Sequence, residues 1–196
     1  MTDNLKPLTS KQIAQLQLDY EGRIGSLLAV DDHVKGIVNK LKATGQYNNT
    51  VIIFTSDNGW LQGEHRVPGD KYLPYEESVK VPFIITGPGI AKKKKMTSQV
   101  SNVDFAATIA KIAGARPGRV LDGKSLLPLK KDNRAILLEA PEPLFASPSM
   151  PQKWDKPYKG VRSNEWKHVV YNQGGEELYD LKKDPYELEK MSSTCL

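Results

Sequence analysis

The sequence predicts an α/β fold from three observations. A long amino-terminal stretch places apolar residues at helical spacing. Two short runs of β-branched and apolar residues, 50–56 and 81–86, follow it and end in turn residues. The last third alternates short β-rich segments with hairpin-turn sequences. A chain of 196 residues can bury a core, as one domain or as one domain with a small annex.

The predicted helix covers residues 7–44. Thr9 and Gln12 have the spacing of a capping box, and Gly45 is suited to end the helix. Because this pattern is long for one helix of a globular protein, we expect a break near Gly22 or Gly25.

The two apolar runs predict strands. Run 50–56 is continuously apolar, which is typical of a strand buried on both faces in the middle of a parallel sheet. Run 81–86 predicts a second buried strand, with Pro82 near its start. Between them, residues 57–80 read as a long, irregular surface loop, a kind of segment that is often functional.

The rest of the chain predicts a short strand over 100–103 and then a helix that Asn102 or Asp104 caps and Gly114 ends. Turn residues then separate four short segments that favour strands. These segments, which predict a small antiparallel sheet, are 135–139, 160–163, 166–171 and 177–181.

Asp57 and Asn58 follow the first strand directly. In open α/β sheets the carboxyl ends of the strands are where ligands bind. A carboxylate beside a carboxamide offers hard oxygen ligands to Ca²⁺ or Mg²⁺. His65 and Lys71, just downstream, are then placed to face an anion bound to that cation. Asp-Asn-Gly alone is also an ordinary turn sequence, so these three residues by themselves do not distinguish a metal site from a turn.

That longer pattern resembles the carboxyl-terminal half of a sulfatase, within the alkaline-phosphatase-like superfamily. The matching motifs are, in chain order, Ser56-Asp57-Asn58-Gly59, Gly63-Glu64-His65, Lys71, Tyr75-Glu76-Glu77-Ser78, Val81-Pro82, Gly87-Pro88-Gly89, Asp122-Gly123-Lys124-Ser125-Leu126 and Glu177-Leu178-Tyr179-Asp180-Leu181. The resemblance covers nearly the whole chain and is strongest to the glucosamine-6-sulfatase and bacterial arylsulfatase group. It implies part of an alkaline-phosphatase-like α/β sandwich over residues 1–130 and a small antiparallel β subdomain over residues 131–196.

The resemblance also implies roles for the residues at the site. Asp57 and Asn58 match the second pair of metal ligands of the family, with Ca²⁺ as the implied cation. Lys71 matches a lysine that contacts the sulfate and its bridging oxygen. His65 either hydrogen-bonds the substrate, orients Glu64, or is a loop histidine satisfied by the backbone. The implied partner is a sulfate ester, either aryl or carbohydrate.

The nucleophile of the family has no match in this sequence. Sulfatases carry a C/S-x-P-x-R motif whose first residue becomes formylglycine. Segment 149–153 has the spacing but ends in Lys and follows the metal residues in chain order, and Cys195 has only one residue after it. We therefore expect a sulfuric-ester hydrolase by family whose formylglycine lies upstream of this chain, which by itself is expected to be inactive.

Two alternatives stay open: a non-catalytic module derived from the fold, and a phosphate or phosphonate ester hydrolase of the same superfamily. An incomplete sheet would expose strand edges, so a partner chain or an oligomer that covers them is expected.

Composition excludes several other classes of protein. The net charge is +5, and the densest basic run, Lys92–Lys95, predicts a solvated loop, with an anionic polymer or a membrane surface as the alternative. No aromatic residues interleave with these lysines, which argues against nucleic acid. A single cysteine excludes a disulfide framework. No apolar run is long enough to span a bilayer, and the sequence leaves the cellular compartment open.

Overall fold

The computed structural model describes residues 5–140 and 157–191. The chain divides into two compact units, Met1–Gly89 and Ile90–Leu196. Segment 149–153 and Cys195 lie outside the described residues. The domain boundary expected near residue 130 stays a prediction, because compactness alone does not define a domain. Among the described residues, no helix combines the length and the apolarity needed to cross a bilayer.

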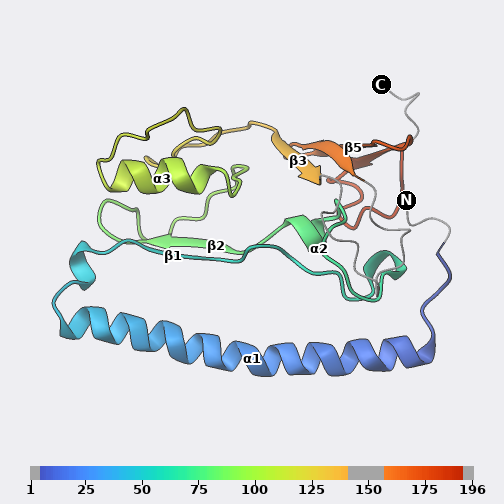
Figure 1. Cartoon of the computed structure of the whole chain (residues 1–196), viewed down its shortest axis with the longest axis horizontal. Helices are drawn as coiled ribbons and strands as arrows, with labels where there is room; N and C mark the ends of the chain where they lie inside the picture. Colours follow the sequence, from blue (N-terminus) through green and yellow to red (C-terminus); the bar gives the residue numbers. More distant parts are fainter. Residues whose placement is uncertain (1–4, 141–156, 192–196) are drawn as a thin grey trace. The chain divides into compact units, whose positions relative to one another are not determined.

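In the first unit, α1 (Ser10–Ala43) is one unbroken helix of 34 residues (Figure 1). The predicted capping box is confirmed: Thr9 and Gln12 satisfy each other's backbone N–H groups. Gly45 follows the helix with a φ of 72°, the left-handed conformation that suits a terminator. The predicted break near Gly22 or Gly25 is wrong, because glycine weakens a helix but keeps the N–H that continues its hydrogen bonds.

The short helix η1 (Tyr47–Asn49) leads into β1 (Ile52–Thr55), which pairs with β2 (Phe83–Thr86). Both predicted strands exist, but in the described residues the first does not lie in the middle of a parallel sheet, and neither strand is fully buried. The two strands are antiparallel, with Ile52 opposite Thr86 and Thr55 opposite Phe83. Phe54 is 38% exposed and Ile84 60% exposed. An apolar run specifies an extended chain, whereas its pairing partner and direction depend on the rest of the fold.

The loop between β1 and β2 folds back on itself instead of running freely over the surface. It carries η2 (Glu64–Arg66) and α2 (Glu76–Val79) (Figure 1). The backbone N–H of Leu61 donates to the carbonyl of Asp70 at 2.8 Å, and this hydrogen bond holds two parts of the loop together. Four of its apolar residues are buried, namely Leu61, Val67, Leu73 and Tyr75, whereas Trp60 is 39% exposed and Tyr72 is 52% exposed. The loop is therefore packed at these four positions.

In the second unit, α3 (Asp104–Ile112) confirms the predicted helix, and Gly114 follows it with a φ of 62°. The strand expected over 100–103 is not formed. The carboxylate of Asp104, at the first turn of α3, accepts the backbone N–H groups of Ser101 and Lys124, each at 2.9 Å. It is also paired with Arg134. This one buried side chain therefore ties the start of α3 to two later segments.

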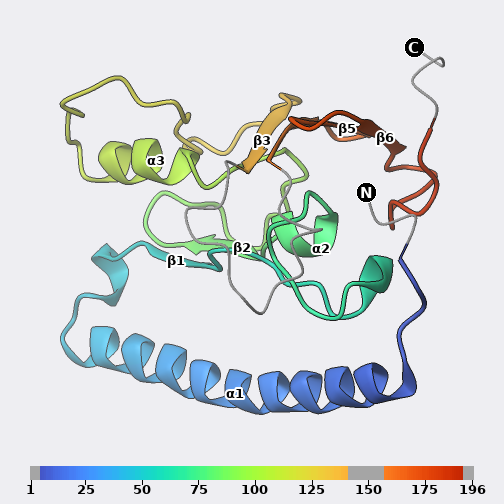
Figure 2. The same ribbon diagram turned by 45° about the vertical axis from the view of Figure 1, so that its right-hand side comes forward.

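The predicted small antiparallel sheet is confirmed in the second unit, in the order β3-β4-β5-β6. Figure 2 labels three of its strands, β3, β5 and β6. Its strands are β3 (Ile136–Ala140), β4 (Tyr158–Arg162), β5 (Trp166–Tyr171) and β6 (Glu176–Asp180). Aromatic and aliphatic side chains form its buried part, among them Tyr158, Val169, Tyr171 and Leu178. The turns at 164–165 and 172–175 lie where the sequence predicted hairpins.

Candidate functional site

The candidate site begins where β1 ends. Asp57 is exposed, and the hydroxyl of Ser56 donates to its carboxylate at 3.3 Å and to the carbonyl of Asn58 at 3.0 Å. The backbone N–H of Asn58 is the main cause that lowers the pKa of Asp57, and the nearby charge of Lys71 lowers it further. The Asp57 side chain is therefore a carboxylate over the whole physiological pH range.

Asn58 and Lys71 are brought together although 13 positions separate them. The Lys71 ammonium donates to Asn58 Oδ1 at 3.2 Å. The Asn58 amide nitrogen donates to the carbonyl of Gly59 at 2.7 Å, and this hydrogen bond sets which end of the carboxamide faces Lys71. The loop thus gathers three of the four predicted site residues: Asp57, Asn58 and Lys71.

Two buried residues fix the backbone of Lys71 from both sides. The carboxylate of Asp70 accepts the N–H groups of Lys71 at 2.6 Å and of Tyr72 at 3.1 Å. The hydroxyl of Ser78, in α2, donates to the carbonyl of Lys71. Asp70 and Ser78 are each only 2% exposed. Because buried hydrogen bonds hold both the N–H and the carbonyl of Lys71, they fix the direction in which its side chain leaves the loop.

Gly59 lets the end of β1 approach α2 closely. Its N–H donates to the carbonyl of Ser78 at 2.8 Å. A Cβ atom at this position would lie less than 3.0 Å from the carbonyl carbon and oxygen of Glu77. Only glycine therefore fits here without a shift of the backbone.

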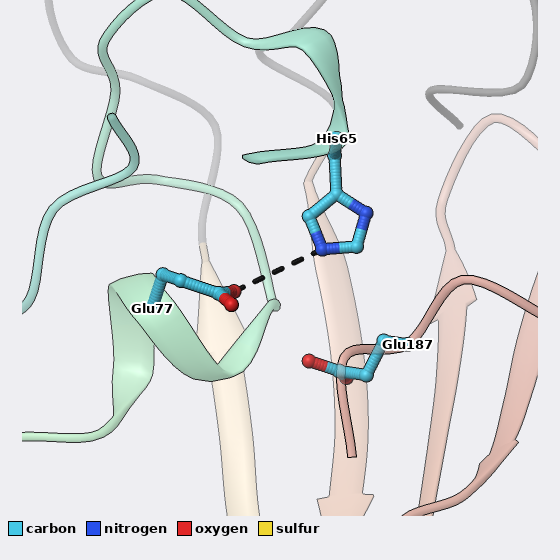
Figure 3. A group of neighbouring side chains, drawn as sticks. All are labelled: His65, Glu77 and Glu187. Carbon is cyan, nitrogen blue, oxygen red and sulfur yellow. Dashed lines mark ion pairs between the residues drawn. The ribbon is translucent and has the colours of Figure 1, made fainter. Parts of the chain in front are cut away.

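His65 has a different environment from the other three predicted residues. Its ring stacks on Tyr75, with the ring centroids 3.7 Å apart. Its Nε2 lies 3.8 Å from a carboxylate oxygen of Glu77, the pair that Figure 3 joins with a dashed line. Glu64 instead accepts the backbone N–H of Gln62. Within the described residues, His65 makes no hydrogen bond to Asp57, Asn58 or Lys71, and its catalytic role stays a prediction.

Sequence reasoning missed Asp70, Ser78 and the packing role of Gly59. An Asp directly before a turn is a local signal, since its side chain often accepts the next backbone N–H groups. Ser78 carries no such signal, because its partner is the carbonyl of a residue seven positions earlier. Its role follows only from the way the loop folds back.

The donor atoms at the end of β1 fit a hard divalent cation. A charged carboxylate and a carboxamide oxygen are oxygen ligands of the kind that Ca²⁺ prefers. Two side chains are too few for a complete shell of six to eight oxygens, so other ligands would have to complete it. The Lys71 ammonium beside them favours an anion bound at the same place.

Comparison with known proteins places the chain in a family. A sulfatase family model matches residues 7–115. A second family model, described as N-sulphoglucosamine sulphohydrolase, C-terminal, matches residues 63–194. The first match covers more than half of the chain and contains all four predicted site residues.

Relatives with curated names agree with these matches. Human N-acetylglucosamine-6-sulfatase is 41% identical over 124 residues, covering 63% of this chain and 22% of the relative. The N-acetylglucosamine-6-O-sulfatase of Bacteroides thetaiotaomicron is 33% identical over 191 residues, covering 95% of this chain and 34% of the relative. The chain thus spans about one fifth to one third of the length of these relatives.

The solved structures lead to the same family. One structure, of a protein in complex with its substrate D-glucosamine-2-N,6-O-disulfate, superposes with a TM-score of 0.75 at 30% identity. The match covers 86% of this chain and 35% of that protein. A structure described as a 2-O GAG sulfatase superposes with a TM-score of 0.69 at 28% identity, over 84% and 36% of the two chains. The chain belongs to the sulfatase family and has part of its alkaline-phosphatase-like α/β fold.

Proposed function

We propose that this chain provides the cation-binding and sulfate-binding half of a sulfuric-ester hydrolase centre, at Asp57, Asn58 and Lys71. The observation that supports it most strongly is the hydrogen bond of 3.2 Å between the Lys71 ammonium and Asn58 Oδ1. This bond sets a fixed positive charge beside the ionised Asp57 at the end of a strand. The arrangement suits a bound cation–oxyanion pair.

Each of the three residues has a distinct task. The oxygens of Asp57 and Asn58 hold the cation, which supplies charge stabilisation to the sulfate oxygens when it is bound. Lys71 binds a sulfate oxygen and stands ready to donate a proton to the alkoxide that leaves. The buried hydrogen bonds from Asp70 and Ser78 hold Lys71 ready for this task before the substrate arrives.

We assign His65 to the scaffold of the loop. Its stacking on Tyr75 and its position 3.8 Å from Glu77 join η2 to α2. On this assignment a change at His65 acts through the position of Lys71 and not on the sulfate directly.

The proposed substrate class is a sulfated carbohydrate. The relatives named N-acetylglucosamine-6-sulfatase and the structure with bound D-glucosamine-2-N,6-O-disulfate support this class over simple aryl sulfates. The 196 residues contain no C/S-x-P-x-R motif to supply a nucleophile. We therefore infer that turnover depends on a nucleophile from residues other than these.

A chimera tests this proposal. Residues that carry a C/S-x-P-x-R motif, taken from the Bacteroides thetaiotaomicron relative, are joined in front of this chain, and hydrolysis of 4-methylumbelliferyl sulfate and of glucosamine-6-sulfate is followed. We expect turnover by the chimera and none by the 196-residue chain. In the chimera, Asp57→Ala and Lys71→Met are each expected to lower kcat/KM at least about a hundredfold, in line with losing one charge-stabilising group.

Lys80→Met is the matched control, because Lys80 is an exposed lysine in the same loop. It is expected to leave kcat/KM within about twofold of the parent chimera, as surface changes usually do. Turnover by the 196-residue chain alone, or a chimera that is indifferent to Asp57→Ala, would contradict the proposal.

A further inference from the structure

We propose that residues 90–134, called here the basic segment, form a binding surface for a sulfated polysaccharide chain. This inference rests on the proposed function, because it takes the polymeric form of the same substrate class. It concerns residues other than the Asp57, Asn58 and Lys71 site. Its basis is the uneven distribution of charge along the chain.

The basic segment holds eleven Lys and Arg residues and three Asp residues, with no Glu, so its net charge is +8. The whole chain has a net charge of +5, so all other residues together have a net charge of −3. Such asymmetry within one chain is typical of a surface that meets a polyanion.

Almost all of these cations face solvent and are uncompensated. Ten of the eleven basic side chains are exposed. None of the ten forms an ion pair within the part of the chain that the structure describes. They are Lys92, Lys93, Lys94, Lys95, Lys111, Arg116, Arg119, Lys124, Lys130 and Lys131.

The eleventh cation, Arg134, pairs with two of the three acidic groups of the segment. Its guanidinium is paired with the buried carboxylate of Asp104 and lies 3.8 Å from that of Asp132. The backbone N–H of Arg134 also donates to Asp132 at 3.0 Å. Together with Asp122, these groups offset only two of the ten exposed positive charges, so the field of the segment is strongly positive.

Hydrogen bonds draw the two lysine-rich parts of the segment together. The backbone N–H of Asp132 donates to the hydroxyl of Ser98 at 2.9 Å. Since consecutive Cα atoms are about 3.8 Å apart, Lys131 lies about 4 Å from Asp132, and Lys95 lies within about 11 Å of Ser98. Lys130 and Lys131 are thus held near the end of the run Lys92–Lys95, and one extended polyanion can contact both.

The composition of the segment favours a sulfated polysaccharide over nucleic acid. Phe105 is the only aromatic residue among positions 90–134, so there is no series of rings on which bases could stack. Exposed ammonium groups on a loop suit the sulfates of a flexible polymer, which need no stacking and no buried pocket. Binding of this kind is electrostatic and weakens as salt screens the charges.

The test measures binding of fluorescein-labelled heparin by the 196-residue chain in EDTA, so that no cation assists the Asp57 site. The variant changes Lys92, Lys93, Lys94 and Lys95 to Gln, and we expect its Kd to rise about tenfold or more, since four exposed ionic contacts are lost. Lys130→Gln with Lys131→Gln is expected to raise the Kd about threefold.

The matched control changes Lys6, Lys11, Lys35 and Lys40 to Gln. These four exposed lysines lie outside the basic segment, and both quadruple variants carry a net charge of +1. The control is expected to raise the Kd no more than about twofold. Equal losses in both quadruple variants would show a dependence on net charge alone and overturn the proposal.

Two further outcomes separate this inference from its alternatives. Vesicles of phosphatidylserine and phosphatidylcholine, or unsulfated hyaluronan, bound as tightly as heparin would overturn the assignment to a sulfated polymer. Lys71→Met is expected to leave heparin binding unchanged while it lowers kcat/KM of the chimera at least about a hundredfold. A heparin surface in a chain whose Asp57 site fails its own test would leave this inference standing and refute the proposed function.

Discussion

At Gly59, the loop between β1 and β2, called here the site loop, leaves no room for a side chain. A Cβ atom there would meet the backbone of Glu77, whereas one at Gly22, within α1, would meet nothing within 4 Å. A comparison of alanine substitutions at Gly59 and Gly22 therefore distinguishes the steric clash at Gly59 from the general effect of adding a methyl group.

We predict that Gly59→Ala lowers the free energy of unfolding by ~2 kcal/mol, because the backbone has to shift to accept the methyl group. Gly22→Ala is the control, and it is expected to raise the free energy of unfolding by up to about 1 kcal/mol, since alanine favours a helix. Urea denaturation followed by circular dichroism measures both. Equal effects of the two substitutions would show that the close approach of Gly59 to Glu77 does not matter.

At the same scale, the sequence identifies which residues carry chemical groups better than it identifies what holds them. Asp57, Asn58 and Lys71 follow from motif and spacing, and the structure brings them together. The roles of Asp70 and Ser78 depend on hydrogen bonds to the backbone of Lys71. The Asp70 bonds are local and follow a recognisable turn pattern, whereas the Ser78 bond forms only after the loop has folded back, so no residue pattern predicts it.

Strand β5 contains a lysine on its buried face. Every second position of β5 holds a buried residue, in the order Lys167, Val169 and Tyr171. The ammonium of Lys167 lies 2.6 Å from a carboxylate oxygen of Glu187. Both side chains of the pair are 0% exposed. A buried ion pair of this kind adds little net stability, but removal of one partner leaves the other charge in a poor solvent.

We therefore predict that Glu187→Gln lowers the free energy of unfolding by ~3 kcal/mol, because the buried ammonium of Lys167 loses the charge of a carboxylate 2.6 Å away. The double variant Lys167→Met with Glu187→Met is expected to recover most of that loss, since it removes both buried charges. Thermal unfolding of the single and double variants makes the comparison. A double variant less stable than Glu187→Gln would show that the pair itself is strongly stabilising.

At the scale of elements, local patterns predict which segments form strands and helices, and they fail for pairing. The hairpin turns at 164–165 and 172–175 connect neighbouring strands, so their order and direction follow from the sequence. Strands β1 and β2 are separated by the whole site loop, and nothing in either run encodes that they pair antiparallel. Likewise, the pattern of α1 predicts its capping box but not its continuity past Gly22 and Gly25.

At the scale of the whole molecule, the chain carries charged groups in two different arrangements. Asp57, Asn58 and Lys71 form a compact site in which a few charges are fixed by hydrogen bonds. The basic segment, in contrast, has a net charge of +8 spread over exposed side chains. The first arrangement suits one sulfate group with its cation, and the second suits a polymer that bears many sulfates.

Nuclear magnetic resonance can show whether the end of β1 binds a divalent cation beside Lys71, as we propose. Ca²⁺ is titrated into the ¹⁵N-labelled chain at pH 7 and at about pH 5, and sulfate is added afterwards. Because the pKa of Asp57 is lowered, its carboxylate stays charged at both pH values, and binding is lost only as pH falls through that lowered pKa.

We predict that Ca²⁺ shifts the backbone resonances of Asp57, Asn58 and Gly59 equally at both pH values, that sulfate then shifts those of Lys71, and that Asp57→Ala removes both effects. Shifts centred on other residues, or unchanged shifts in Asp57→Ala, would contradict the account.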